Sequence, residues 1–193
     1  MTREDDRMLE TKILEGRIDY TGDQLRSHFV REMAGITADG VVAFTGACAV
    51  TGSMLVDLED AEQHSSIIAG EMLHFIGEHF ECTLREANYR LRLFVSIVGE
   101  SIRKLAPGLV LTRAGDDLYI GERKLTVAIA TVTPVSTVFH CGVNIDPQGA
   151  PVPAVGLGEI GVDEEKFAAA VLDQYRREYL SIDNAIRKVR GVG

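Results

Sequence analysis

The stretch GDDLYIGERKLTVAI, residues 115–129, holds Lys124 between a Gly-Glu turn and a long apolar run. Gly121 and Glu122 suit a tight turn between two antiparallel strands. Because side chains two residues apart in a strand point to the same face, Lys124 should share its face with small side chains. The residues expected on that face are Lys124, Thr126, Ala128 and Ala130, with Leu125, Val127 and Ile129 on the other.

The next β-rich run is VSTVFHCGVNI, residues 135–145. The same alternation puts His140 and Asn144 on one face and Phe139 and Cys141 on the other. If this strand pairs with the lysine strand, a lysine, a histidine, an asparagine and several small side chains share one concave surface. Such a surface offers positive charge and amide hydrogen bonds to a carboxylate or a phosphate. The pattern also fits an exposed hairpin lysine and a packed histidine that bind nothing.

Helix and strand signals are interspersed along the rest of the chain. Apolar residues at three- and four-residue spacing predict helices, and β-rich runs between turn residues predict strands. The expected helices cover residues 21–35, 60–79, 84–105 and 167–189, and the expected strands cover 41–46, 54–58, 109–112, 117–120, 124–132 and 135–145. This order predicts a single α+β domain over residues 1–193, with a mostly antiparallel sheet that carries helices on one face.

Composition and charge exclude several classes of partner. The formal net charge is -9 and no basic stripe is interrupted by aromatic residues, so we expect no nucleic-acid partner. No stretch approaches the roughly 20 continuous apolar residues that span a bilayer. The N-terminal segment MTREDDRMLE lacks the apolar core of a signal peptide. We therefore expect a cytoplasmic protein with no membrane partner.

A second group of polar residues lies in HSSIIAGEMLHFIGEH, residues 64–79. On the expected helix, Glu71, His74 and Glu78 fall within one narrow arc. Asp57 precedes that helix. Histidine and carboxylates at helical spacing can bind a divalent metal, which makes a metal-dependent hydrolase one alternative function. The spacing also fits a solvated polar face on which His74 and Glu78 form a pair.

The lysine hairpin resembles the core of the biotin and lipoate protein ligase superfamily, which is related in fold to class II aminoacyl-tRNA synthetases. Those ligases carry Asn-Asp-Leu-Tyr, a short turn, then Arg-Lys and a strand, as in residues 115–129. FHCGVNID, residues 139–146, resembles their following strand, and lipoyl-synthesis octanoyltransferases are similar too. The resemblance implies that Lys124 is an active-site lysine and that Asp117 matches the aspartate of the ligases' Asn-Asp pair.

The whole chain is identified as a member of a prokaryotic family, the domain-of-unknown-function family 366. The residues that carry this likeness are RIDYTGDQLRSHF (17–29), VDLEDA (56–61), MLHFIGEHF (72–80) and the lysine hairpin. The family is grouped with the same ligase superfamily and has no established activity. Membership therefore implies a fold more directly than a reaction.

The ligase resemblance implies a protein that binds a small carboxylic acid and forms an acyl-adenylate with ATP and Mg²⁺. Lys124 would stabilise the carboxylate and the α-phosphate, and Asp117 or Asp57 would hold magnesium or position the lysine. The residues expected to contact substrate or nucleotide are Thr45, Gly46, Arg123, Thr126, His140 and Asn144. An acyl-acceptor protein is an implied partner, and a homodimer is the commonest oligomer.

The chain also departs from the characterised enzymes. Where lipoate ligases have an Arg-Arg and a glycine-rich loop, residues 43–54 read AFTGACAVTGSM and keep few of those glycines. Close approach of a backbone to phosphate favours glycine, so this loop weakens the case for a nucleotide. Octanoyltransferases need a nucleophilic cysteine where residues 152–161 read VPAVGLGEIG. A non-catalytic ligand-binding or regulatory module on the same fold is therefore the second alternative.

Overall fold

The computed structural model describes residues 9–192, so most of the N-terminal segment that argued against a signal peptide lies outside the described residues. A five-stranded sheet has the order β1-β2-β3-β8-β7. Its strands are β1 (Glu10–Arg17), β2 (Gly40–Val50), β3 (Ile67–His79), β7 (Thr126–Val132) and β8 (Thr137–Asp146). β1 runs parallel to β2, and the other three pairs of strands are antiparallel.

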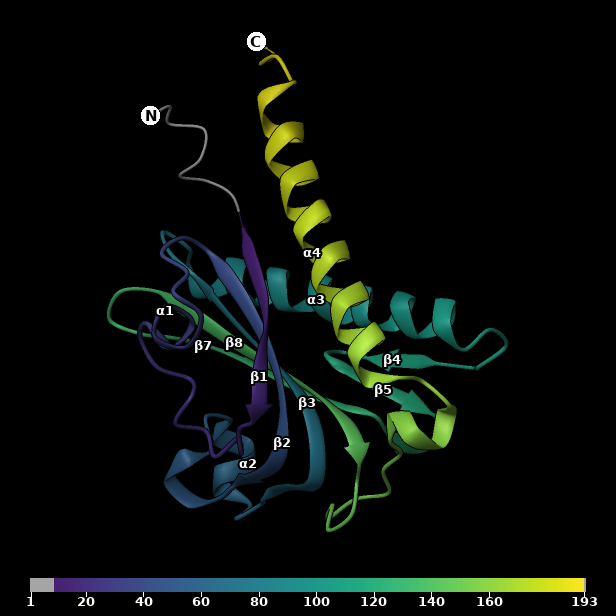
Figure 1. Cartoon of the computed structure of the whole chain (residues 1–193). Helices are drawn as coiled ribbons and strands as arrows, with labels where there is room; N and C mark the ends of the chain where they lie inside the picture. Colours follow the sequence, from purple (N-terminus) through teal and green to yellow (C-terminus); the bar gives the residue numbers. More distant parts are fainter. Residues whose placement is uncertain (1–8, 193) are drawn as a thin grey trace.

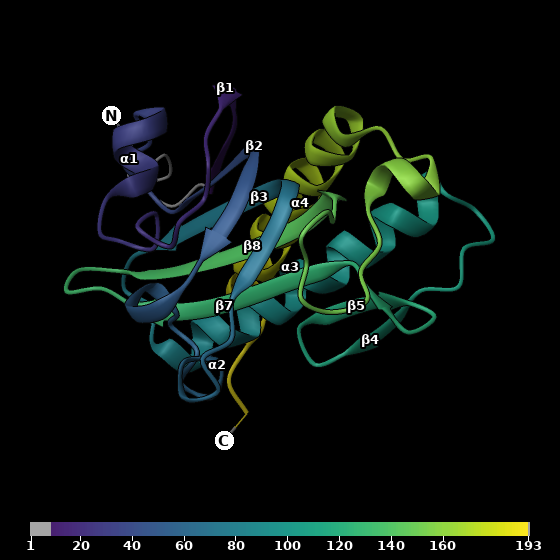
Figure 2. The ribbon, with the colours of Figure 1, turned by 90° about the horizontal axis from the view of Figure 1, so that it is seen from below.

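A second, smaller sheet lies beside the first near β7 (Figure 2). It has three antiparallel strands, β4 (Thr112–Ala114), β5 (Asp117–Ile120) and β6 (Arg123–Lys124). Gly121 adopts a positive φ of 60° in the turn between β5 and β6, a conformation in which glycine carries no steric penalty. The predicted lysine hairpin is therefore present.

Two long helices, α3 (Leu84–Leu105) and α4 (Glu164–Arg187), pack on one face of the large sheet (Figure 1). Thr83 and Glu86 form a capping box at the start of α3, and Asp163 caps α4. The core between helices and sheet includes Phe94 of α3 and Tyr175 of α4. The predicted α+β class, with a mostly antiparallel sheet and helices on one face, is confirmed.

The opposite face of the sheet carries shorter elements. These are α1 (Phe29–Ala34), a 3₁₀ helix (Gly52–Met54) and α2 (Leu58–Glu62). A second apolar cluster lies here and includes Tyr20, Phe44 and Met72. Another 3₁₀ helix (Leu157–Ile160) follows β8. Within residues 9–192, no helix combines the length and the apolarity needed to cross a bilayer.

The helix predicted over residues 60–79 is wrong, because Ile67–His79 forms the central strand β3. From Met72 to His79 every residue is buried, so both faces of this strand are covered. A strand buried on both faces has no period-two alternation, and its apolar residues can match a helical spacing by chance. The predicted strand over residues 54–58 is also wrong, since these residues close the 3₁₀ helix and lead into α2.

Near the N-terminus the predicted helix over residues 21–35 is shortened to Phe29–Ala34. The backbone nitrogen of Thr21 does donate to Gln24 Oε1, at 3.1 Å, but this contact closes a turn. The helix cannot extend backwards because His28 has a left-handed backbone, with φ 64°. β1 was not predicted, since most of its residues are exposed and polar.

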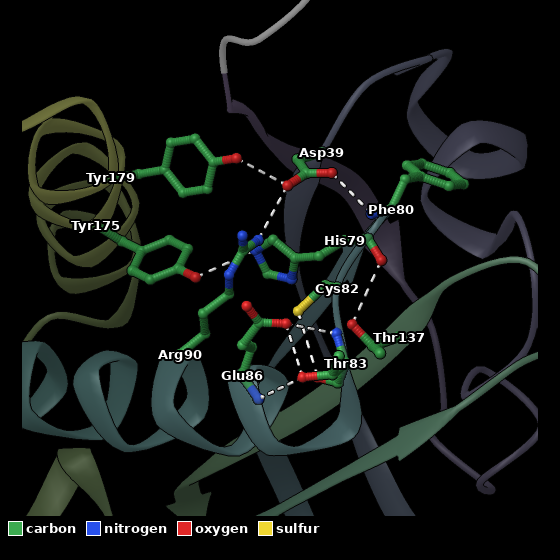
Figure 3. A network of polar contacts seen from close by, with 10 residues as sticks. All are labelled: Asp39, His79, Phe80, Cys82, Thr83, Glu86, Arg90, Thr137, Tyr175 and Tyr179. Carbon is green, nitrogen blue, oxygen red and sulfur yellow. Dashed lines mark hydrogen bonds and ion pairs between the residues drawn. The ribbon is translucent and has the colours of Figure 1, made fainter. Parts of the chain in front are cut away.

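A network of polar contacts ties both long helices to the sheet (Figure 3). Asp39, just before β2, accepts hydrogen bonds from the Arg90 guanidinium at 3.0 Å and the Tyr179 hydroxyl at 2.9 Å. Its other carboxylate oxygen accepts from the backbone nitrogen of Phe80 at 2.8 Å. One carboxylate therefore joins α3, α4 and the end of β3. This contact fixes the helix layer on the sheet.

Candidate functional site

A cavity of about 540 Å³ lies beside the second apolar cluster, on the sheet face away from α3 and α4. Strands β7 and β8 form part of its wall, and the segment around α2, the loop after β8 and the β5–β6 hairpin complete it. The polar residues of the lining are Tyr20, Asp57, Asp60, Ser65, Ser66, Asp116, Asp117, Lys124, His140 and Asn144. The volume is typical of a site for a small molecule.

Lys124 and Asp117 form an ion pair in this cavity. Lys124 Nζ lies 2.8 Å from Asp117 Oδ2, and the two side chains are 26% and 22% exposed. Burial raises the pKa of Asp117, while the hydrogen bond and the charge of Lys124 act in the opposite direction. The Tyr119 hydroxyl also donates to Asp117 Oδ2, at 3.3 Å. The carboxylate is thus held by two donors and in turn holds the ammonium group.

The backbone of Lys124 is held as firmly as its side chain. Its nitrogen donates to the carbonyl of Pro153 at 2.9 Å, and its carbonyl accepts from the nitrogen of Val155 at 3.0 Å. The Asn144 side-chain nitrogen donates to the same carbonyl at 3.1 Å. Asn144 therefore positions the lysine strand, and the loop after β8 pairs with that strand. Lys124 is a cation fixed in place before any ligand arrives.

The predicted faces of the lysine strand are only partly correct. Leu125 and Thr126 are both completely buried, and Thr126 lies opposite Val143, which belongs to the core beneath the helices. Thr126 Oγ1 accepts a hydrogen bond from the nitrogen of Leu118 at 2.8 Å. The alternation breaks between β6 and β7, so Val127 and Ile129 line the cavity with Lys124, together with Ala128 as predicted.

His140 lies in the cavity wall and is hydrogen-bonded to a second buried histidine. Its Nε2 lies 3.0 Å from His74 Nδ1, and His74 Nε2 lies 3.2 Å from the carbonyl of Gly46. Tyr20 stacks on His140 with ring centroids 3.9 Å apart and an angle of 13° between the planes. Burial lowers the pKa of His74 to about 4 and that of His140 well below its usual value. Both imidazoles are neutral at pH 7.

Besides Thr126, three residues predicted to contact a ligand lie away from the cavity. Thr45 and Gly46 belong to β2, and the segment that follows β1 crosses close to them, with the nitrogen of Ile18 donating to the carbonyl of Thr45. A Cβ atom at Gly46 would lie 2.0 Å from the carbonyl oxygen of Ile18, so this glycine makes room for backbone. Arg123 is exposed and pairs with Glu159 at 2.6 Å. Residues 43–50 are strand, and they form no phosphate-binding loop at Gly46.

The predicted metal ligands are not gathered in one place. Side chains four residues apart in a strand are about 13 Å apart, so His74 and Glu78 cannot share an ion as they could on a helix. Glu71 pairs with Arg17 at 2.8 Å, and Asp57 caps α2. Within residues 9–192 no group of three or more histidine, cysteine or acidic side chains could hold a metal. The helix-borne metal site therefore has no basis in the fold.

Two features of the site could not be identified from the sequence. Tyr20 lies more than a hundred residues before His140, and no motif marks it. The charge balance of the cavity was also missed. Its lining contains Lys124 and four aspartates, Asp57, Asp60, Asp116 and Asp117, so acidic side chains outnumber the single cation. An anionic ligand with several charges needs a counter-ion to enter such a cavity.

Comparison with known proteins links the chain to a family and to a fold. A family model described as "Domain of unknown function (DUF366)" matches residues 9–190. The uncharacterized protein MJ0805 of Methanocaldococcus jannaschii is 32% identical over 182 residues, which cover 91% of this chain and 81% of that protein. Neither the description of the family nor the name of this protein assigns an activity.

Solved structures extend the comparison. A protein of unknown function from Pyrococcus horikoshi has a TM-score of 0.90 and 34% identity, with 96% of this chain and 100% of that chain covered. A biotin protein ligase from Aquifex aeolicus in complex with biotin and ATP has a TM-score of 0.56 and 16% identity, with 89% and 70% covered. A lipoate-protein ligase A bound with ATP has a TM-score of 0.56 and 13% identity, with 89% and 86% covered. The fold is that of biotin and lipoate ligases.

Proposed function

This chain belongs to the DUF366 family, and from its ligase fold and the geometry around Lys124 we propose that it binds a small carboxylic acid and activates it for transfer. The observation that carries the proposal is the fixed ammonium group of Lys124, 2.8 Å from Asp117 in a cavity of about 540 Å³. A cation that is already oriented stabilises developing negative charge without reorganisation. Lys124 is the single Lys or Arg side chain among the lining residues that the structure describes.

The cavity suits an acid with an apolar body. Apolar side chains that include Leu55, Met72 and Val127 line it, while Lys124 stands at the polar end beside Asp117. In the proposed complex the carboxylate of the ligand lies against Lys124, and Asp117 keeps the ammonium group in place. The apolar body lies along β7 and β8. This arrangement follows the usual composition of small-molecule sites, where a few polar groups orient a mostly apolar ligand.

Activation would use ATP. A carboxylate oxygen of the bound acid attacks the α-phosphorus, the bond from that phosphorus to the bridging oxygen breaks, and pyrophosphate leaves with its electron pair. Lys124 faces both the carboxylate and the α-phosphate, so its charge stabilises the transition state in which negative charge spreads over the phosphate oxygens. The product is an acyl-adenylate, which an acyl-acceptor protein would consume.

The acidic lining gives Mg²⁺ a defined place in this proposal. Mg²⁺ in nucleotide sites is held by one or two carboxylates together with substrate phosphates and waters. Asp60 and Asp116 line the cavity and are not engaged by Lys124, but Asp116 pairs with Arg92 at 3.4 Å, so Asp60 is the side chain that would hold the ion. The ion would supply neutralising charge on the phosphates.

One observation favours a second function, a module that holds an acid without turning it over. The ligase resemblance implies that Gly46 contacts a ligand, but the backbone of Ile18 fills the space beside this glycine. A protein that lacks a phosphate-binding loop at this position can keep the acid site and lose the nucleotide. The two functions differ in whether the bound acid releases pyrophosphate from ATP.

Acid-dependent exchange of labelled pyrophosphate into ATP tests the proposed function. The assay takes the full chain with Mg²⁺, ATP and individual acids, which include lipoate, octanoate, biotin and amino acids. We expect one acid class to support exchange in the wild type and in Arg123→Ala, and none to do so in Lys124→Met. Arg123 is the matched control because it neighbours Lys124 but pairs with Glu159 outside the cavity. Acid binding without exchange would favour the second function.

A further inference from the structure

The two buried histidines near the cavity form a hydrogen-bonded chain with one allowed direction. A carbonyl oxygen can only accept a hydrogen bond, so His74 Nε2, 3.2 Å from the Gly46 carbonyl, carries the proton. In a neutral imidazole the other nitrogen is then an acceptor, and His74 Nδ1 accepts from His140 Nε2 at 3.0 Å. His140 must therefore carry its single proton on Nε2. Its Nδ1 is left with a lone pair.

Burial keeps both rings in this neutral form. His74 and His140 are at most 3% exposed, and burial lowers the pKa of each, that of His74 to about 4. Protonation of both imidazoles would also place two cations in contact. The tautomer of His140 is thus set by the carbonyl of Gly46, two hydrogen bonds away.

His140 Nδ1 opens into the cavity. No residue of the described chain, 9–192, donates a hydrogen bond to it, and it is absent from the enclosed atoms that lack a partner. Since His140 lines the cavity, the space that this nitrogen reaches is the ligand space. Tyr20, which stacks on His140, also lines the cavity, and burial raises the pKa of Tyr20 so that its hydroxyl keeps its proton. This end of the cavity therefore offers His140 Nδ1 as an obligatory acceptor.

The acceptor lies far from the lysine end. His140 and Asn144 share one face of β8 and are four residues apart, which corresponds to about 13 Å along the strand. Asn144 holds the carbonyl of Lys124, so the lysine end and the His140 end lie at opposite limits of the β8 face in the cavity. A ligand whose carboxylate meets Lys124 reaches His140 only with its far end.

We propose that the acid bound at Lys124 carries an N–H donor, such as an amide or urea group, at the end remote from its carboxylate, and that His140 selects for this donor. The inference rests on the proposed acid site. An acid with a plain alkyl or disulfide-containing tail would leave His140 Nδ1 without a partner in a desolvated position, which costs affinity. An ester or ketone at the same position would bring two acceptors together and bind more weakly still.

Matched ligands test the inference on the wild-type protein. The monoamide and the monomethyl ester of one dicarboxylic acid have nearly the same size, and they differ in the presence of the N–H donor. We expect calorimetric titration across the series from adipic to sebacic acid to find one length at which the monoamide binds about tenfold or more tightly than the ester. In His140→Phe, which keeps an aromatic ring against Tyr20, the ratio should fall to about one. In Lys124→Met both ligands should weaken together.

A measurement on the unliganded wild type avoids any dependence on a variant that folds poorly. Two-bond ¹H–¹⁵N correlation spectra at pH 7 distinguish the protonated from the unprotonated ring nitrogens of each histidine. We expect His140 to carry its proton on Nε2, with Nδ1 unprotonated. A proton on His140 Nδ1 would overturn the inference, because this nitrogen would then present a hydrogen-bond donor to the ligand.

The outcomes separate the inference from the proposed function. Equal, Lys124-dependent binding of monoamide and ester, or binding of octanoate as tight as that of the monoamide, would overturn the role of His140 and leave the acid site standing. If no monoamide or monoester of any chain length binds, and lipoate, octanoate and biotin do not bind either, the proposed acid site is wrong. The inference about His140 is then wrong too.

Discussion

Lys124 Nζ and Asp117 Oδ2 lie 2.8 Å apart on adjacent strands of one short hairpin, and both residues line the same cavity. The hairpin turn brings them together, and the backbone contacts of Lys124 with Pro153 and Val155 prevent the strand from moving. The pair therefore belongs both to the folded structure of the hairpin and to the proposed ligand site. Mutation separates these two roles, because one affects stability and the other affects binding.

Replacing Lys124 by methionine should leave the protein folded. Both partners of the ion pair are about a quarter exposed, so removal of the lysine leaves a partly desolvated Asp117 that keeps the Tyr119 hydroxyl as a donor. We expect urea denaturation to show a loss of about 1–2 kcal/mol for Lys124→Met. The control Arg123→Met removes an exposed pair and should cost under about 1 kcal/mol. A loss of several kcal/mol would show that Lys124 is chiefly a structural residue.

Gly46→Ala should destabilise the fold strongly. The new methyl group would lie 2.0 Å from the carbonyl oxygen of Ile18, and neither β2 nor the segment after β1 can move away without breaking the hydrogen bonds between them. We expect a loss of at least about 2 kcal/mol in the free energy of unfolding. Gly158→Ala is the control, since its nearest neighbour is 3.9 Å away. Wild-type stability in Gly46→Ala would mean that the segment around Ile18 is not held as described.

Asp39→Ala should loosen the helix layer. The substitution leaves the Arg90 guanidinium, the Tyr179 hydroxyl and a backbone nitrogen without their shared acceptor (Figure 3). We expect a loss of about 2–4 kcal/mol, measured by chemical denaturation. Asp173→Ala removes an exposed pair with Arg177 on α4 and should cost under about 0.5 kcal/mol. Equal effects of the two substitutions would contradict the importance of the Asp39 network.

The stability of the protein should fall as the pH is lowered from 7 to 5. Burial lowers the pKa of His74 to about 4 and that of His79 to about 3, while the unfolded chain titrates near 6.5. Below that value the unfolded chain binds protons that the folded chain does not, so the free energy of unfolding decreases with falling pH. Each such histidine contributes a slope of at most about 1.4 kcal/mol per pH unit.

Urea denaturation at pH 7 and pH 5 checks this dependence in a range where most carboxyl groups remain ionised. His79→Gln should reduce the difference between the two pH values, whereas the control His64→Gln, at an exposed position, should leave it unchanged. A stability that stays constant or rises toward pH 5 would be inconsistent with three buried neutral histidines.

Removal of Mg²⁺ should abolish any binding of ATP. Four aspartates and one lysine line the cavity, so the uncomplexed nucleotide meets net repulsion. We expect Mg-ATP to bind in a calorimetric titration and ATP with EDTA to give no measurable heat. Asp60→Asn should weaken the Mg-ATP complex. If ATP binds as well in EDTA, the ion does not have the role proposed for it.

The sequence predicted the elements whose burial is one-sided. α3 and α4 each have one apolar stripe that packs on the sheet, and the three- and four-residue spacing of these stripes predicted both helices. β8 alternates between the helix core and the cavity, so His140 and Asn144 were placed on the correct face. The Lys124–Asp117 hairpin was found because its turn and the ligase resemblance both lie in one short stretch.

The parts that could not be predicted depend on contacts across the chain. β3 is covered on both faces, so nothing in its local pattern distinguishes it from a helix. The face of β7 was misassigned because the chain passes from one sheet to another at Leu125, where simple alternation fails. Tyr20 and the acidic balance of the cavity arise from segments that meet only in the folded protein.

Thermal unfolding of the wild type and of Lys124→Met, with Mg-ATP and a pool of lipoate, octanoate, biotin and amino acids, tests the central claim most directly. A ligand at about 100 times its dissociation constant raises the free energy of unfolding by about 2.7 kcal/mol, which corresponds to an increase of about 5 °C or more in Tm. We predict an increase of this size in the wild type and its loss in Lys124→Met. No increase with any combination, or the same increase in both proteins, would contradict an acid site at Lys124.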